Sequence, residues 1–261
     1  MASLVSQMPF EKELEAARRA ALRAGEIALG YFARGVAAEV KSDLSPVTAA
    51  DRECERVIAA LLNEAFPDDG LLGEEGARKE PRGGRRWIID PIDGTRDFVR
   101  GLDTWGVMIA LEAGGEAVVG VVNLPVQTEL YCAARGAGAY RNDQRLSISA
   151  IADPAQALLC VNGFNIVTKL PFAPRLLEWM SRFWAVRSMG GCRDAMLIAS
   201  GRAEVWIEPA AHPWDLAPLQ IIAEEAGARF FNFDGGHSIH GGNCILCVPS
   251  LDTEVREFLG I

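Results

Sequence analysis

Two aspartates three residues apart are the strongest candidates for chemistry in this sequence. Asp90 and Asp93 lie in the segment WIIDPIDGT, where an apolar strand pattern runs directly into a proline and a glycine that break it. Two carboxylates this close repel each other in apolar surroundings, and a hard cation that takes oxygens from both relieves the repulsion. The irregular backbone can turn the carbonyl of Ile92 toward such an ion, and the free N–H groups from Thr95 onward suit a phosphate oxygen. A polar turn in which one aspartate caps a helix is the simpler alternative.

Further acidic residues stand at comparable positions. Glu74 and Glu75 follow a short apolar run, and Asp215 lies at the predicted start of a helix in the segment PWDLAP. Asp51 falls at the capping-box position three residues after Thr48. Taken singly, each has a simpler explanation: a solvated loop for the glutamates, a helix cap for either aspartate. Counted together with the first pair, these acids indicate a site for divalent cations.

Three motifs in this order make the chain resemble the inositol monophosphatase family of magnesium-dependent phosphatases: GEE at 73–75, DPIDGT at 90–95 and WD at 214–215. The resemblance extends from Lys41 to the last predicted strand. It implies an α/β fold in which layers of helices and sheets alternate, as in the inositol monophosphatase and fructose-1,6-bisphosphatase type. It also implies hydrolysis of a small phosphate monoester by metal-activated water, two or three Mg²⁺ ions, inhibition by lithium, and a homodimer.

The resemblance assigns a role to each residue of these motifs. It implies that four carboxylates and one backbone carbonyl bind the metal: Glu74, Asp90, Asp93, Asp215 and Ile92. Thr95, with Glu74, matches the group that orients or activates the attacking water, and Asp51 and Lys41 match residues close to that water. A surface lysine is the alternative for Lys41. The backbone at Gly94 and Thr95 matches the family's phosphate-binding segment.

The second half of the chain is expected to select the alcohol. Glu208 aligns with a family glutamate that reaches substrate hydroxyl or amine groups, with a surface acid after a strand as the alternative. Gly191 and Cys192 match the helix entry beside the leaving group, whereas Arg193 and Asp194 are unusual there and could equally face solvent. The expected substrate-binding set is Asp93, Gly94, Thr95, Gly191, Cys192, Arg193, Glu208 and Asp215.

Several stretches look more like the histidinol-phosphate phosphatase branch of the family. They are KSDLSPVTAADRECE at 41–55, DGLLGEE at 69–75, GTRDFVRG at 94–101 and IEPAAHPWDLAPL at 207–219. The leaving alcohol would then be cationic, and a pocket with Glu208, Asp194 and, as a further candidate, Asp97 would favour it by charge complementarity. Against this branch, the family often has Asn or Ser at the position of Asp97.

Other functions remain open at this point. Inositol 1-phosphate is the alternative substrate, and an adenosine 3′,5′-bisphosphate is less well matched because that branch tends to have DPLDGT. A regulatory metal-binding partner protein is the alternative of another class. The intact set of metal-binding and water-orienting residues favours an active enzyme, because a protein that acts only through contacts has no chemical need for all of them.

The elements that must position these residues follow from periodicity. Apolar residues at helical spacing predict a helix over 11–33 and a second one after Thr48. Strands are expected at 87–89, 105–111, 117–122 and 129–133, and then at 158–161, 184–187, 203–207 and 245–248, with helices at 176–183, 192–200 and 214–226 between them. We therefore expect two halves, 1–150 with most metal ligands and 151–261 with Asp215 and the residues that select the substrate.

Composition narrows the class of protein further. The chain has 261 residues and a formal net charge of −9 at pH 7, which argues against nucleic acid as the main partner. No apolar run is long enough to span a membrane and no signal peptide is evident, so we expect a cytoplasmic protein. Cys244 and Cys247 are expected to be half-buried thiols on opposite strand faces, and His237 and His240 to lie in a surface loop.

Overall fold

The computed structural model describes residues 9–41 and 46–261. The first eight residues, on which the expectation of no signal peptide partly rests, and residues 42–45 of the stretch at 41–55 therefore lie outside the described residues. Within them the helices are α1 (Glu11–Arg34), α2 (Ala49–Ala65), α3 (Thr95–Arg100), α4 (Phe164–Val167), α5 (Ala173–Met180), α6 (Gly191–Ala199), α7 (Pro213–Glu225) and α8 (Asp252–Leu259).

The strands form two large sheets and one short pair. The larger sheet has the order β10-β9-β8-β7-β6-β5-β3-β4, the smaller one β12-β11-β13-β15-β14, and β1 pairs with β2. Their bounds are β1 Glu39–Val40, β2 Pro46–Val47, β3 Gly70–Gly73, β4 Arg78–Lys79, β5 Arg85–Asp93, β6 Gly106–Ala113, β7 Glu116–Leu124, β8 Glu129–Ala134, β9 Gly138–Arg141, β10 Gln144–Arg145, β11 Leu158–Val161, β12 Ala185–Arg187, β13 Val205–Glu208, β14 Arg229–Phe231 and β15 Cys244–Cys247.

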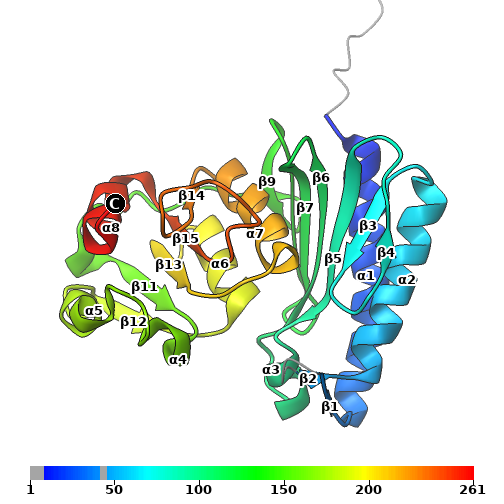
Figure 1. Cartoon of the computed structure of the whole chain (residues 1–261), viewed down its shortest axis with the longest axis horizontal. Helices are drawn as coiled ribbons and strands as arrows, with labels where there is room; N and C mark the ends of the chain where they lie inside the picture. The colour runs from blue at the N-terminus through cyan, green and yellow to red at the C-terminus, as the bar shows by residue number, and fades with distance from the viewer. Residues whose placement is uncertain (1–8, 42–45) are drawn as a thin grey trace, which may run out of the picture.

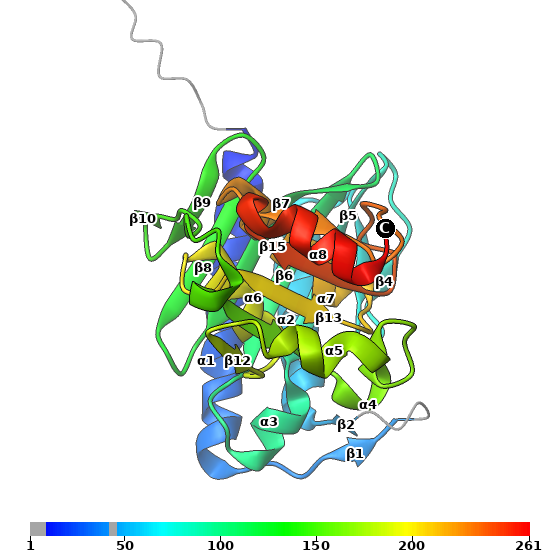
Figure 2. The ribbon, with the colours of Figure 1, turned by 90° about the vertical axis from the view of Figure 1, so that its left-hand side faces the viewer.

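Helices and sheets alternate in layers across the molecule, which confirms the predicted fold class. Figure 1 shows α1 and α2 on one face of the larger sheet, α6 and α7 between the two sheets, and α5 and α8 beyond the smaller sheet. In the view turned by 90°, α5 and α8 lie in front of the smaller sheet (Figure 2). Trp179 of α5 stacks on Phe258 of α8 at a ring distance of 4.0 Å, which joins the two outer helices.

Three apolar clusters hold these layers together. One lies between α1, α2 and the larger sheet, one surrounds α6 and α7 between the sheets, and one lies between the smaller sheet and its outer helices. Helix α7 belongs to the second half of the chain but packs on β6 and β7 of the first. Because this packing carries the start of α7 to the end of β5, it brings Asp215 to the aspartates of the first half. A domain boundary near residue 150 stays a prediction.

The predicted helices and strands are present, and several shorter elements were not predicted, among them α3, α4, β9, β14 and α8. The periodicity over 11–33 corresponds to α1, and the capping box of Thr48 and Asp51 begins α2. The sequence pattern did not indicate β14 or α8. Only Val255 and Phe258 of α8 are buried, so its apolar stripe is too short to stand out.

The thiols of β15 differ from our expectation. Cys244 and Cys247 point to opposite faces, as predicted, but both are completely buried rather than half-buried. The reason is that β15 is an inner strand, paired with β13 and β14, and both faces of the smaller sheet are covered. His237 and His240 are exposed, which confirms their expected surface position.

Candidate active site

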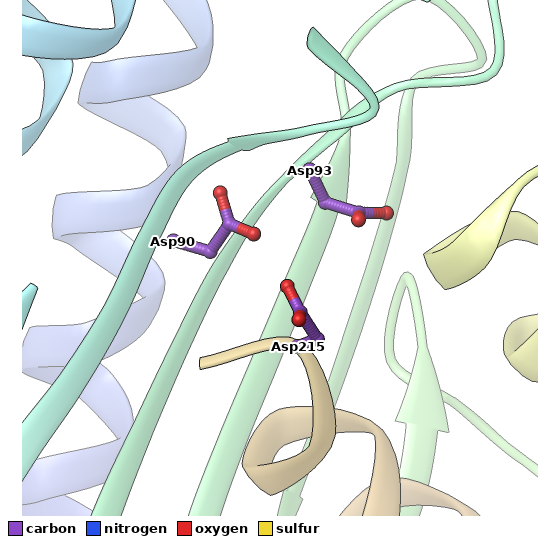
Figure 3. A group of neighbouring side chains, drawn as sticks. All are labelled: Asp90, Asp93 and Asp215. Atoms are coloured by element: carbon purple, nitrogen blue, oxygen red, sulfur yellow. The ribbon is translucent and has the colours of Figure 1, made fainter. Parts of the chain in front are cut away.

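An irregularity in β5 brings two aspartates to the same side of the sheet. Residues three apart on a regular strand point to opposite faces. The pairing of β5 with β6 shifts between Asp90 and Asp93, and this bulge turns the second carboxylate toward the first. Oxygens of Asp90, Asp93 and Asp215 all lie within 4.8 Å of one another, and Figure 3 shows the three side chains converging from β5 and from the start of α7.

Each of these carboxylates is held by a backbone N–H. Asp90 accepts from Ile92 at 3.0 Å, Asp93 accepts from Cys192 at 2.8 Å, and Asp215 accepts from His212 at 2.6 Å. The donors of the last two stand at the starts of α6 and α7. The carboxylates are therefore fixed by the fold.

The electrostatics of this group call for a cation. Burial, followed by the charges of the neighbouring carboxylates, raises the pKa of Asp90 well above its ordinary value. Burial also raises the pKa of Asp93 and Asp215, although hydrogen bonds from Cys192 and His212 oppose the rise. Charged carboxylates at such short separations are stabilised by a metal ion that takes oxygens from several of them. Oxygen donors of this kind fit Mg²⁺.

Glu74 joins the same site from the neighbouring strand. Strand β3 runs parallel to β5 with Gly73 opposite Ile89, so Glu74 and Asp90 leave the sheet at the same edge. The N–H of Glu74 donates to the carbonyl of Ile89 at 3.1 Å. Its Oε1 accepts from Lys41 Nζ at 2.8 Å, so Lys41 is paired with a predicted metal ligand, and its predicted role in the site stays a prediction.

The turn that carries Glu74 has its own supports, which the sequence pattern did not reveal. Lys41 also pairs with Glu75, whose pKa burial raises to about 6 against the opposing effect of the lysine. The buried carboxylate of Glu55 on α2 accepts the N–H groups of Glu75 and Ala77, both at 2.7 Å. Glu55 was not predicted because nothing in its local pattern separates it from an exposed helix acid.

Thr95 and Asp51 form the expected pair beside the carboxylates. The Thr95 hydroxyl lies 3.3 Å from Asp51 Oδ1 and 3.1 Å from the carbonyl oxygen of Ile92. Asp51 Oδ2 accepts from the backbone N–H and the hydroxyl of Thr48 at 2.8 and 2.6 Å. Asp51 therefore closes the capping box of α2 and also contacts Thr95, and its role beside the attacking water stays a prediction.

A cavity of about 430 Å³ opens over these residues. We call the part lined by Glu74, Asp90, Ile92, Asp93, Thr95 and Asp215 its metal end, and the part lined by Gly163, Trp206 and Glu208, which belong to the smaller sheet or follow its strands, its other end. Gly191, Ala211 and Leu219 also line the cavity. Gly94, Arg96 and Asp97 line it as well. Gly191 is needed for close approach, because a Cβ there would lie 3.1 Å from both carboxylate oxygens of Asp93.

Three residues of the α6 entry do not line this cavity. The Cys192 side chain is fully buried, and its contribution is the N–H bound to Asp93. Arg193 donates to Glu129 of β8 at 3.0 Å, and Asp194 is fully buried, accepting the N–H groups of Met189 and Gly190. These partners turn the side chains away from the substrate space. Substrate contacts by Cys192 and Arg193 side chains, and a share of Asp194 in an acidic pocket, do not fit these positions.

Trp206 is a cavity residue that sequence reasoning missed. It precedes Glu208 by two residues on β13, so both side chains lie on the face of the smaller sheet that meets α6 and α7. Its indole N–H is buried and has no hydrogen-bond partner within the described part of the chain. The alternation of β13 could have revealed it, since residues i and i + 2 share a face.

Comparison with known proteins shows the family to which the chain belongs. The family model described as "Inositol monophosphatase family" matches residues 10–257, and the chain belongs to this family of phosphatases, whose members depend on metal ions. The chain is 42% identical over 231 residues to a histidinol-phosphatase of Chlorobaculum parvum, covering 88% of this chain and 89% of the relative. It is 37% identical over 222 residues to a histidinol-phosphatase of Mycobacterium tuberculosis, covering 83% and 85%.

Relatives with other names match over similar lengths. Nus factor SuhB of Pasteurella multocida is 34% identical over 249 residues, covering 93% of each chain. The solved structure of an IMPase from Thermotoga maritima superposes with a TM-score of 0.86 at 29% identity, covering 95% of this chain and 97% of that one. Within residues 9–41 and 46–261, no helix is both long and apolar enough to cross a membrane.

Proposed function

We propose that this phosphatase hydrolyses histidinol phosphate to histidinol and phosphate with Mg²⁺. The observation that carries the proposal is the division of one cavity into two ends: carboxylates suited to a metal at one end, and the acidic side chain of Glu208 at the other. The first end accounts for a phosphate ester and the second for a cationic alcohol. The identity to histidinol-phosphatases supports the same substrate.

Glu74, Asp90, Asp93, Asp215 and the carbonyl of Ile92 would hold the metal, two or three ions in number as the family resemblance implies. Bound Mg²⁺ would supply Lewis-acid stabilisation of the phosphoryl oxygens and lower the pKa of the attacking water. All five groups line the cavity, and none is an imidazole or a thiolate. A set of oxygen donors is what Mg²⁺ requires.

The chain's own residues would orient the water and the phosphate. The hydroxyl of Thr95 contacts Asp51 and the Ile92 carbonyl, which supports a role in orienting the attacking water, and Glu74 is the proposed acceptor of that water's proton. The backbone of Gly94 and Thr95 is the proposed phosphate cradle. Gly94 has a φ of 84°, a left-handed conformation that favours glycine at the start of α3.

The leaving group would lie against Glu208. Burial, with the charge of nearby Asp93, raises the pKa of Glu208 to about 7, and hydrogen bonds from the Asn162 side chain and the Ala210 backbone oppose the rise. A cationic alcohol stabilises the charged form of such a carboxylate, whereas a neutral polyol offers only hydrogen bonds. Asp97 adds a second acid to the lining of the cavity. The preference for a cation therefore depends on these two side chains, without Asp194.

A direct test is phosphate release from histidinol phosphate and from inositol 1-phosphate under the same Mg²⁺ concentration. We expect a higher kcat/KM for histidinol phosphate, and we expect Glu208→Gln to reduce that preference by roughly tenfold or more, as for loss of a charged hydrogen bond. Equal or better use of the inositol ester by the wild type would contradict the assignment. Turnover in excess chelator would contradict the metal requirement.

The family resemblance further supports a cytoplasmic homodimer, which we propose as the working form. Light scattering coupled to size-exclusion chromatography tests it, with a monomer as the contradicting result.

A further inference from the structure

Three parallel strands of the smaller sheet end side by side at the cavity. Strand β11 lies between β12 and β13 and is parallel to both, with Cys160 opposite Arg187 and Val161 opposite Ile207. One step further along, Asn162 stands opposite Glu208, and Ser188, the residue after β12, is level with Val161. The three residues therefore lie at one edge of the sheet. In α/β sheets the carboxyl ends of parallel strands are where ligands bind.

These three polar side chains form one directed chain of hydrogen bonds. The Ser188 hydroxyl donates to Asn162 Oδ1 at 3.2 Å, and Asn162 Nδ2 donates to Glu208 Oε2 at 3.0 Å. The backbone N–H of Asn162 is bound to the carbonyl of Ile207 at 3.0 Å, which fixes the residue at the strand end. Asn162 is 9% exposed, so its amide has little access to water.

The direction of these hydrogen bonds determines which group of Asn162 faces Glu208. An asparagine amide can present either its NH₂ group or its oxygen to a neighbour. Ser188 engages the oxygen, which leaves the NH₂ group for Glu208. With Oε2 occupied, Glu208 has Oε1 for a donor from a ligand. Because Glu208 lines the cavity and Asn162 stands beside it, the arrangement of strand ends sets which carboxylate oxygen the leaving group meets.

We infer that Asn162, oriented by Ser188, is a positioning residue that aims Glu208 at the leaving alcohol and so helps to set selectivity for a cationic substrate. This inference rests on the proposed function. Asn162 does not itself have to touch the substrate. Its effect should pass entirely through Glu208, and this separates the inference from a role in which Asn162 only completes the edge of the sheet.

The test is a double-mutant cycle on selectivity. The quantity measured is the ratio of kcat/KM for histidinol phosphate to that for inositol 1-phosphate, in the wild type, Asn162→Leu, Glu208→Gln and the double variant. We expect Asn162→Leu to lower the ratio about tenfold, mainly through KM for histidinol phosphate. In the Glu208→Gln background the same change should have almost no further effect, because interacting residues are not additive.

Two further variants provide a milder test and a control. Ser188→Ala, a milder change at an exposed residue, should lower the ratio by roughly threefold, within the range for one neutral hydrogen bond. Asn165→Leu, an exposed asparagine on α4, is the matched control and should leave the ratio unchanged. Circular dichroism and thermal melting establish that each variant is folded. If Asn162→Leu does not fold, Ser188→Ala decides the question.

The outcomes distinguish the two proposals. Turnover of histidinol phosphate by the wild type, with a ratio unchanged in Asn162→Leu and Ser188→Ala, overturns the inference and leaves the proposed function standing. A fall in the ratio that is equally large with and without Glu208 also overturns it, since Asn162 would not act through that carboxylate. No turnover of histidinol phosphate by the wild type overturns both.

Discussion

The two ends of the cavity are built in different ways. At the metal end, Asp90, Asp93 and Asp215 are each held by a backbone N–H, so their geometry follows from the bulge in β5 and the starts of α6 and α7. At the end proposed for the leaving group, Glu208 accepts from the side chain of Asn162, and the backbone of Ala210 makes a smaller contribution. Backbone hydrogen bonds can hold the metal-binding carboxylates in the same positions throughout a family. Preference for one substrate, when it depends on side-chain contacts, can change by a single substitution.

Helix α6 connects the two ends. Its first residue, Gly191, lines the cavity, and the N–H of Cys192 holds Asp93. Arg193 pairs with Glu129 of the larger sheet and fastens the helix across the two halves of the chain. Substitutions at the metal end should therefore change the rate for every substrate alike, and substitutions at the leaving-group end should change the ratio between substrates.

The largest effect is expected for Asp93→Asn. A neutral amide replaces a buried carboxylate, so metal affinity and charge balance both suffer, and turnover should fall by several orders of magnitude on every phosphate ester. An amide oxygen can still accept from Cys192, so far-UV circular dichroism should stay native. Asp103→Asn, at an exposed aspartate, is the control and should keep wild-type turnover. Near wild-type rates in Asp93→Asn would show that the metal end is assigned wrongly.

A smaller effect is expected for Thr95→Ala. The hydroxyl between Asp51 and the Ile92 carbonyl is lost, so the attacking water is poorly oriented, and turnover should fall by roughly 100-fold. The Mg²⁺ concentration at half-maximal rate should change much less, since the proposed role of Thr95 is to orient water. Thr95→Ser keeps the hydroxyl and should retain most of the activity. A large loss of metal affinity with little loss of maximal rate would assign Thr95 to the metal instead.

The residues of the metal end could be predicted from the sequence more fully than those of the other end of the cavity. Asp90, Ile92, Asp93 and Thr95 lie within six residues of the chain, so their motif is visible without a fold, and Asp215 was found through the WD motif that resembles the family. Asn162, Ser188 and Glu208 come from three strands, and their meeting depends on the register of the smaller sheet. No local pattern reports that register, which is why only Glu208 was found, by its resemblance to a family residue.

The sequence also could not predict which neighbours the side chains of a helix would contact. The sequence left Arg193 and Asp194 open between the cavity and solvent, and the structure gives them protein partners, Glu129 for one and the N–H groups before α6 for the other. A helical period tells which residues share a face but not which neighbour that face meets. Long amphipathic helices such as α1 were predictable, because packing against a sheet decides most of their pattern.

The smallest expected effect is on the pH dependence of stability, which tests the metal end without any substrate. Burial and mutual repulsion raise the pKa of Asp90, Asp93 and Asp215, so the folded metal-free protein keeps protons that the unfolded chain has lost. Its stability should therefore fall as the pH rises above the ordinary aspartate value of about 4, through the raised pKa values of the folded state. In excess chelator, the melting temperature should drop by several degrees between about pH 5 and 8.

Mg²⁺ should reverse that trend, because it binds the charged carboxylates and competes with the protons. The rise in melting temperature on adding Mg²⁺ should therefore grow with pH. Asp93→Asn removes one of the repelling charges, so in chelator its melting temperature should depend less on pH than that of the wild type, and Mg²⁺ should raise it less. Glu208→Gln, at the other end of the cavity, should keep the full response to Mg²⁺. Scanning calorimetry of the three proteins measures this, and an equal response to Mg²⁺ in all three would contradict the placement of the metal at Asp93.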